Sequence, residues 1–71
     1  MAAFESGSGV VDEFDEQRGW GTILADDGDV LPFHCTAIAD GSRTVEAGRH
    51  VQFRVSPGLS GRWEATGVEK V

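Results

Sequence analysis

The sequence has little of what secreted proteins and most enzymes depend on. Its 71 residues include one cysteine, two prolines and no tyrosine. A chain of this length forms one domain at most and buries only about 60% of its unfolded surface, so a deep catalytic cleft is not expected. The single Cys35 cannot form an intramolecular disulfide, which indicates a reducing environment such as the cytoplasm.

Long apolar segments are also missing. No run of residues approaches the ~20 apolar positions that a membrane-spanning helix requires. The first nine residues, MAAFESGSG, lack the basic start and the apolar stretch of a secretion signal. We therefore expect a soluble, cytoplasmic protein without a membrane partner.

Basic residues are scarce, with six Lys and Arg against twelve Asp and Glu, and the net charge is −6. Residues 1–40 contain nine acidic residues and only Arg18 as a basic one, whereas residues 41–71 carry a net charge of +2. Contacts to phosphate need Lys and Arg. A nucleic-acid surface would therefore have to combine Arg18 with the arginines of the C-terminal half.

Glycine and β-branched residues are abundant, which favours short strands joined by turns. Asp27-Gly28 is a strong hairpin turn because it accepts positive φ, and Val51, Phe53 and Val55 alternate with polar residues. We expect a flexible segment 1–8 and one domain over 9–71, with a single helical turn at 36–39. The predicted strands are 9–14, 19–25, 29–34, 49–56 and 61–69.

Five short strands joined by glycine-rich turns favour a small, closed or nearly closed antiparallel barrel, because closure removes unpaired sheet edges. Pro32 has no N–H, so it must lie at an edge, at a bulge or at the open seam of the barrel. We expect Phe53, Val51, Ile23 and Leu31 to be the most buried side chains. The predicted inward positions are Val11, Ile23, Leu31, Phe33, Val51, Phe53, Val55, Ala65 and Val68.

The outer face of the second and third strands carries the candidate site. Alternation places Trp20, Thr22, Pro32 and His34 there, close to Arg18 in the sequence. An exposed tryptophan beside an exposed histidine is typical of a platform on which nucleobases stack, at about 1–3 kcal/mol per base. The glycines on both sides of Trp20 would let the strand approach a ligand closely. His34 is equally consistent with an ordinary surface histidine.

The order and spacing of several motifs resemble those of the bacterial cold-shock domain. RGWGTI (18–23) stands at the first RNA-binding motif of that family, and LPFHC (31–35) stands at the second. GVVDEF (9–14) matches the first strand, TAI (36–38) follows the second motif, and TVEAGRHVQFRV (44–55) matches the fourth strand. The resemblance covers residues 9–68.

This resemblance implies a five-stranded antiparallel OB-fold barrel that binds single-stranded RNA or DNA and is not an enzyme. Of the ring positions that the family uses, Phe14, Trp20 and His34 are kept. The other three are Thr22, Pro32 and Cys35 here, and a Lys and a Trp of the first strand are replaced by Asp12 and Glu13. Phe14 is equally consistent with a core position.

We therefore expect weak, salt-dependent binding of single-stranded nucleic acid by a monomer, as an RNA chaperone or a regulator of transcription or translation. The alternative is an OB-type barrel that has lost nucleic-acid binding and serves as a protein-interaction module, since aromatic rings are lost and acids are gained. Trp63 is favoured as a packing or lid residue, and in the other interpretation it would restore some stacking surface beside Arg62. The candidate binding residues are Phe14, Arg18, Trp20, Thr22, His34, Arg62 and Trp63.

No metal site, cofactor or catalytic group is expected. His34 and Cys35, as neighbours in a strand, would point to opposite faces, and only His50 remains as a further soft ligand. Cys35 has no evident base and orienting residue. The acidic turn 26–29 lacks the bidentate Glu and the regular ligand spacing of a calcium loop.

Overall fold

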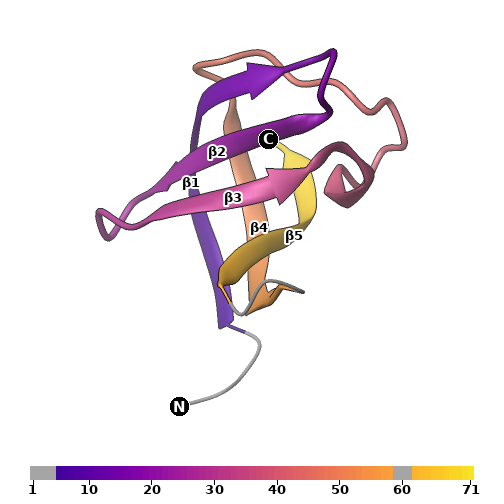
Figure 1. The fold of residues 1–71 in the computed structure, drawn as a ribbon. Helices are drawn as coiled ribbons and strands as arrows, with labels where there is room; N and C mark the ends of the chain where they lie inside the picture. Colours follow the sequence, from indigo (N-terminus) through magenta and orange to yellow (C-terminus); the bar gives the residue numbers. More distant parts are fainter. Residues whose placement is uncertain (1–4, 59–61) are drawn as a thin grey trace.

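The computed structural model describes residues 5–58 and 62–71, which form five strands and one helical turn (Figure 1). All strand pairings are antiparallel, in the order β3-β2-β1-β4-β5. This confirms the predicted all-β fold with five antiparallel strands. The elements are β1 (Glu5–Asp15), β2 (Trp20–Ala25), β3 (Val30–His34), η1 (Cys35–Ala37), β4 (His50–Pro57) and β5 (Trp63–Lys70).

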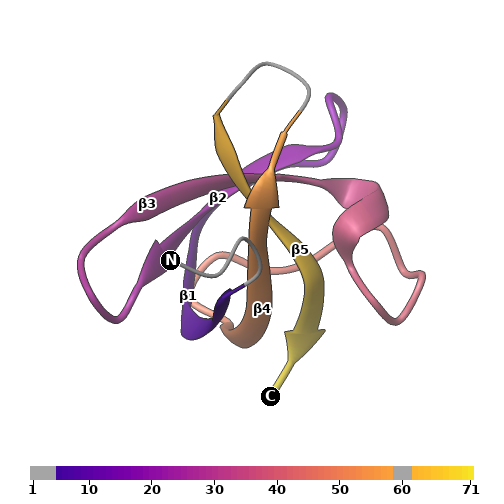
Figure 2. The same cartoon turned by 90° about the horizontal axis from the view of Figure 1, so that it is seen from below.

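Strand β1 organises the sheet because it pairs on both sides. Its residues from Gly9 to Asp15 pair with β2, and those from Glu5 to Val10 pair with β4, so Gly9 and Val10 belong to both ladders. A side chain at Gly9 would collide with the backbone carbonyl of Leu24, which explains the glycine. The ribbon bends along β1, and the hairpins β2–β3 and β4–β5 close around a common interior (Figure 2).

The strand boundaries differ from expectation mainly at the N-terminus. Strand β1 begins at Glu5 rather than at residue 9, because residues 5–8 pair with β4. The division into a flexible segment 1–8 and a domain 9–71 stays a prediction, and residues 1–4 lie outside the described part. The expected start of the last strand at residue 61 also lies outside it, and β5 is described from Trp63.

The barrel has a seam between β3 and β5, which contact each other without forming a ladder in the described residues. The links across this region are a parallel bridge between Ile38 and Val68 and a hydrogen bond of 2.8 Å from the Ala39 N–H to the Val68 carbonyl. Pro32 lies in the edge strand β3, so its missing N–H leaves no gap in a ladder. Of the three positions expected for Pro32, which were an edge, a bulge and the open seam of the barrel, the structure shows the edge.

The core confirms the predicted alternation. Every predicted inward residue is buried except Val55, which is partly buried. Ala25, Ile38 and Val45 join the core as well. The expectation that Leu31 and Phe53 are among the four most buried residues was wrong, since both line an open cleft at the mouth of the barrel. The largest fully buried side chains are Phe33, Ile23, Val11, Val51 and Val68.

The predicted helical turn is present as η1, which begins one residue earlier than expected. His34 caps it, because the Nδ1 atom of His34 accepts a hydrogen bond of 3.3 Å from the Thr36 N–H. No helix within residues 5–58 and 62–71 has the length and apolar character needed to cross a membrane.

The connection between η1 and β4 is tied to β5 by charged and polar groups. The Lys70 ammonium lies 3.1 Å from the Asp40 carboxylate and donates a hydrogen bond of 2.9 Å to the Ser42 hydroxyl. The Ser42 N–H donates to Asp40 over 2.9 Å. Hydrogen bonds from Ser42, followed by Lys70, lower the pKa of Asp40 from 3.8 to about 2.

Replacing Phe33 by alanine should destabilise the protein most strongly, because its ring is 0% exposed and stacks on Phe14. Loss of a buried Phe side chain costs on the order of 3–5 kcal/mol. We expect Phe33→Ala to be largely unfolded at 25 °C in a urea titration. The control is Val30→Ala on the same strand, where the side chain is 58% exposed. Equal effects of the two changes would show that the core is wrongly placed.

Asp40→Asn should change how stability depends on pH. Because folding lowers the pKa of Asp40, its ionised form stabilises the fold above pH about 4, and this contribution is lost as the pH falls towards about 2. The difference in unfolding midpoint between the wild type and Asp40→Asn should therefore shrink between pH 4 and pH 2. Urea titrations at four pH values measure it, and a constant difference would contradict the proposed role of the carboxylate.

Candidate functional site

The outer face of β1, β2 and β3 carries two rows of side chains that the strand register brings together. Directly opposed residues of antiparallel strands point to the same face, with Cβ atoms about 4.5–5.5 Å apart. The first row is Asp15, Trp20 and His34, and the second row is Glu13, Thr22 and Pro32.

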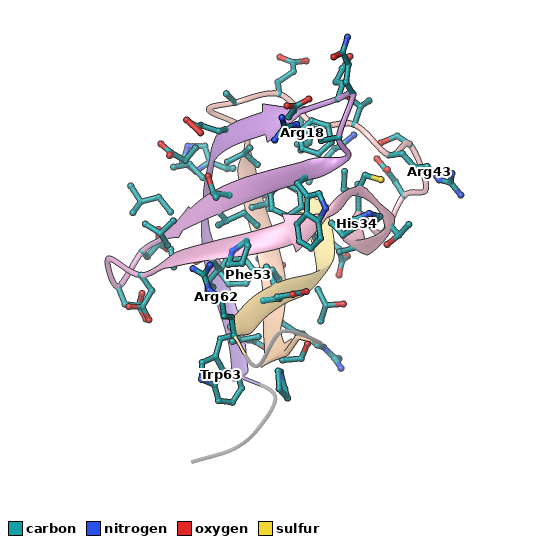
Figure 3. The ribbon with its side chains drawn as sticks, viewed as in Figure 1. Arg18, His34, Arg43, Phe53, Arg62 and Trp63 are labelled. Atoms are coloured by element: carbon teal, nitrogen blue, oxygen red, sulfur yellow. The ribbon has the colours of Figure 1, made fainter. Side chains whose placement is uncertain are left out.

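Trp20 and His34 form the aromatic part of the first row, as the alternation predicted. Their ring centroids are 5.0 Å apart with an interplanar angle of 79°, which is an edge-to-face contact. The imidazole is oriented by Thr36, whose hydroxyl lies 2.8 Å from Nδ1 (His34 is labelled in Figure 3). Trp20 is 43% exposed. The contact holds the indole in place while much of it stays accessible.

Both rows contribute to a shallow groove of about 830 Å³ beside the turn that joins β1 and β2. Trp20, Thr22 and Pro32 line it from β2 and β3, and Phe14 lines it from β1. The remaining charged lining residues are Asp12, Glu13, Asp15, Glu16 and Arg18. The groove therefore combines an aromatic surface with a predominantly acidic wall.

Arg18 is the only basic residue among the described groove residues. Its side chain is 83% exposed, and its Nε atom lies 3.8 Å from the Asp15 carboxylate. An exposed ion pair at this distance contributes little, so the guanidinium can turn towards a ligand. Figure 3 shows Arg18 at the end of the molecule opposite to Trp63.

Phe14 lies on the inner side of the sheet. Its ring stacks on Phe33, with centroids 5.7 Å apart and an interplanar angle of 16°. The register between β1 and β2 shifts between Val11 and Glu13, so that Asp12 forms a bulge. This bulge turns Phe14 towards the core and Glu13 outwards. Phe14 is half-buried and forms part of the groove floor, whereas its role as a stacking residue stays a prediction.

The two glycines beside Trp20 are explained by the packing and the backbone of the barrel, whereas the sequence suggested the close approach of a ligand. A Cβ atom on Gly21 would lie 2.8 Å from both the Phe14 and the Phe33 rings and 2.6 Å from the Glu13 carbonyl oxygen. Gly21 thus makes room for the core, not for a ligand. Gly19 lies in the turn before β2 with a φ of 71°, a conformation that favours glycine, and its carbonyl accepts a hydrogen bond of 2.7 Å from the Cys35 N–H.

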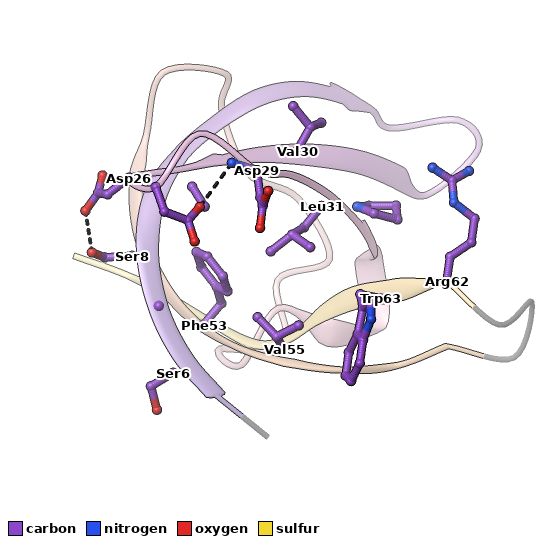
Figure 4. Close-up of a pocket in the computed structure, with 14 residues that line it drawn as sticks. Ser6, Ser8, Asp26, Asp29, Val30, Leu31, Phe53, Val55, Arg62 and Trp63 are labelled. Carbon is purple, nitrogen blue, oxygen red and sulfur yellow. Dashed lines mark hydrogen bonds between the residues drawn. The ribbon is translucent and has the colours of Figure 1, made fainter. Parts of the chain in front are cut away.

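Arg62 and Trp63 line a second cleft, of about 630 Å³, at the mouth of the barrel (Figure 4). Its floor is formed by Leu31, Phe53 and Val55, and Trp63 is 43% exposed. The structure therefore does not bring Arg62 and Trp63 into one groove with Trp20. Pro32 lines both the cleft and the groove.

Three residues of the two rows were not among the candidate binding residues, namely Glu13, Asp15 and Pro32. Glu13 and Pro32 stand at family positions that have lost an aromatic ring, and alternation had also placed Pro32 on the outer face. Their placement in one row with Thr22 depends on the bulge and on the β2–β3 register. The outward position of Glu13 could not be inferred from simple alternation, because it depends on the bulge.

Cys35 lies closer to His34 than expected. Strand β3 ends at His34 and Cys35 begins η1, so the two side chains do not point to opposite faces, and the Cys35 Sγ atom lies 3.9 Å from Nδ1 of His34. Within residues 5–58 and 62–71, no three His, Cys, Asp or Glu side chains are grouped in a way that could hold a metal ion.

Comparison with known proteins extends over nearly the whole chain. The family model "'Cold-shock' DNA-binding domain" matches residues 7–71. The chain is 33% identical over 60 residues to the cold shock-like protein CspD of Vibrio cholerae, and the match covers 82% of this chain and 79% of that protein. It is also similar to the solved structure of Drosophila Unr CSD456, with a TM-score of 0.77 and 25% identity. That match covers 94% of this chain and 27% of the Drosophila chain.

Gly21→Ala should destabilise the fold, although the new methyl group is small. The Glu13 carbonyl belongs to the sheet and cannot move freely, and overpacking of this kind costs about 1–3 kcal/mol. Thr22→Ala, at the next and outward-facing position, is the control and should change stability much less. Thermal unfolding followed by circular dichroism measures both variants. An unchanged melting temperature for Gly21→Ala would mean that the close approach of Phe14 and Phe33 is wrong.

Proposed function

The chain belongs to the cold-shock domain family, and on this basis we propose that it binds single-stranded RNA or DNA on the outer face of β1, β2 and β3. The observation that carries this proposal is the accessible Trp20, held edge-on by His34 in an open groove. Nucleobases stack on exposed aromatic rings of this kind irrespective of sequence. An open, shallow groove also suits an extended strand better than it suits a small substrate.

In the proposed complex, one base stacks on Trp20 beside His34, and the next base lies over Thr22 and Pro32. Arg18 is the group that meets a phosphate, since it is the basic residue at the groove. Phe14 supports the floor from below. Arg62 and Trp63 extend the surface past Pro32, which borders both hollows.

The charge distribution supports weak binding, in which the salt-dependent part comes from the phosphate contact of Arg18. Four carboxylates and one guanidinium line the groove, so the nucleic acid gains its affinity mainly from stacking. We propose that the protein acts as a monomeric binding module in the cytoplasm, as an RNA chaperone or regulator, without a cofactor or a reaction of its own.

The alternative of a protein-interaction module is supported by the acidic wall of the groove and by the loss of aromatic rings from the family motifs. A Trp20 covered by a loop would have favoured it, and Trp20 is instead accessible. Family membership also favours nucleic acid, because the matching model is described as a DNA-binding domain.

Trp20→Ala tests this function directly. We expect it to weaken binding of a fluorescently labelled single strand by about ten- to hundredfold, because each stacked base contributes roughly 1–3 kcal/mol. Stability should change little, since Trp20 is half-exposed. The measurement is fluorescence anisotropy at low salt, with the melting temperature recorded for the same samples.

The matched control is Leu24→Ala. Leu24 lies on the same strand and the same face and is 40% exposed, but it lines neither the groove nor the barrel-mouth cleft. Its affinity should stay within a factor of about two of the wild type, because it contributes no stacked ring. Absence of binding by the wild-type protein at low salt would overturn the proposed function, and equal losses for both variants would move the site away from Trp20.

A further inference from the structure

The row formed by Glu13, Thr22 and Pro32 differs in chemistry from the row of Trp20 and His34 beside it. It presents a carboxylate, a hydroxyl and an apolar ring from three adjacent strands. The bulge at Asp12 is what turns the Glu13 side chain outwards, since regular alternation from the buried Val11 would have turned it inwards. The row therefore offers hydrogen-bonding groups where its neighbour offers rings.

The Glu13 carboxylate has no partner among residues 5–58 and 62–71. Neither the salt bridges nor the side-chain hydrogen bonds of this part involve it, whereas Asp15, Asp26 and Asp40 each hold a neighbouring group. An ionised carboxylate is purely an acceptor, with two oxygens that can receive two parallel donors. A ligand in the groove would thus meet an open, bidentate acceptor beside the Thr22 hydroxyl.

Guanine matches this pair of groups better than the other bases. Its Watson–Crick edge places the N1–H and N2–H₂ donors side by side, followed by the O6 acceptor. Adenine and cytosine place an acceptor next to their amino group, and the N3–H of uracil lies between two acceptors. Each of these bases would set a lone pair against the second carboxylate oxygen, which is unfavourable.

We propose that Glu13 and Thr22 read one guanine of the bound strand, an inference that rests on the proposed nucleic-acid function. Glu13 accepts from N1–H and N2–H₂, Thr22 donates to O6, and the Pro32 ring supports the face of the base. Residues two apart on one strand face are about 6.8 Å apart, so the base over Thr22 is the neighbour of the base stacked on Trp20. In this row, hydrogen bonds that select the base take the place of stacking on an aromatic ring.

Four seven-nucleotide RNA strands test the proposal. They are heptauridylate and the same strand with guanosine, inosine or adenosine at the central position. A good bidentate contact discriminates by roughly five- to hundredfold, so the guanosine strand should bind more tightly than heptauridylate by about that factor. Inosine lacks the N2 amino group and should bind with intermediate affinity. Adenosine should give no such gain.

Two variants separate base selection from charge. Glu13→Gln and Asp12→Asn each remove one negative charge from the same groove wall, but only Glu13 lies opposite Thr22. Glu13→Gln should bind heptauridylate more tightly and lose the preference for guanosine, because the amide offers one acceptor and one donor. Asp12→Asn should bind all four strands more tightly by a similar factor and keep the preference.

The possible outcomes are distinct. If the wild type binds none of the four strands at low salt, the proposed function itself fails. If it binds all four with equal affinity, the function stands and guanine selection is overturned. The same conclusion follows if Asp12→Asn abolishes the preference as completely as Glu13→Gln does, since the effect would then be one of charge. Melting temperatures near that of the wild type show that both variants are folded.

Discussion

The structure depends on one strand that pairs with two others. The first half of strand β1 pairs with β4 and its second half pairs with β2, and Gly9 and Val10 take part in both ladders. Strand β1 pairs with the β2–β3 hairpin on one side and with the β4–β5 hairpin on the other, and the inner faces of these strands meet in one core. In so short a chain, this sharing lets five strands enclose a core without a long helix. It also leaves β3 and β5 as the edges of the seam.

The bulge at Asp12 links this architecture to the binding surface. It allows Val11 and Phe14 to face the core although they are three positions apart, and it sends Glu13 outwards between them. Gly21 on the opposite strand then accommodates the Phe14 and Phe33 rings. The bulge therefore sets both the packing of the inner face and the chemistry of the outer face. A substitution on one face of the sheet is expected to affect the other face.

Most departures from the family motifs lie close together in the structure. The row around Trp20 keeps its rings. Three of the four lost ring positions lie together in the row around Thr22, where a carboxylate, a hydroxyl and a proline ring replace them, and the fourth is Cys35 beside His34. Scattered losses would suggest decay of a binding surface. Three losses gathered in one row, with an acceptor that has no partner among the described residues in their place, are better explained by a change in what that row recognises.

The sequence by itself determined the strand content, the Asp27-Gly28 hairpin, most of the core and the outward position of Trp20 and His34, because two-residue alternation and turn chemistry are local. Motif order and spacing identified the family. Only the tertiary structure decided that Phe14 faces inwards, that Glu13 lies beside Thr22, and that Arg62 and Trp63 line a separate cleft. These placements depend on a bulge, on register and on which strands become edges. Such features are fixed by contacts between distant segments, and a periodic pattern along one strand carries no information about them.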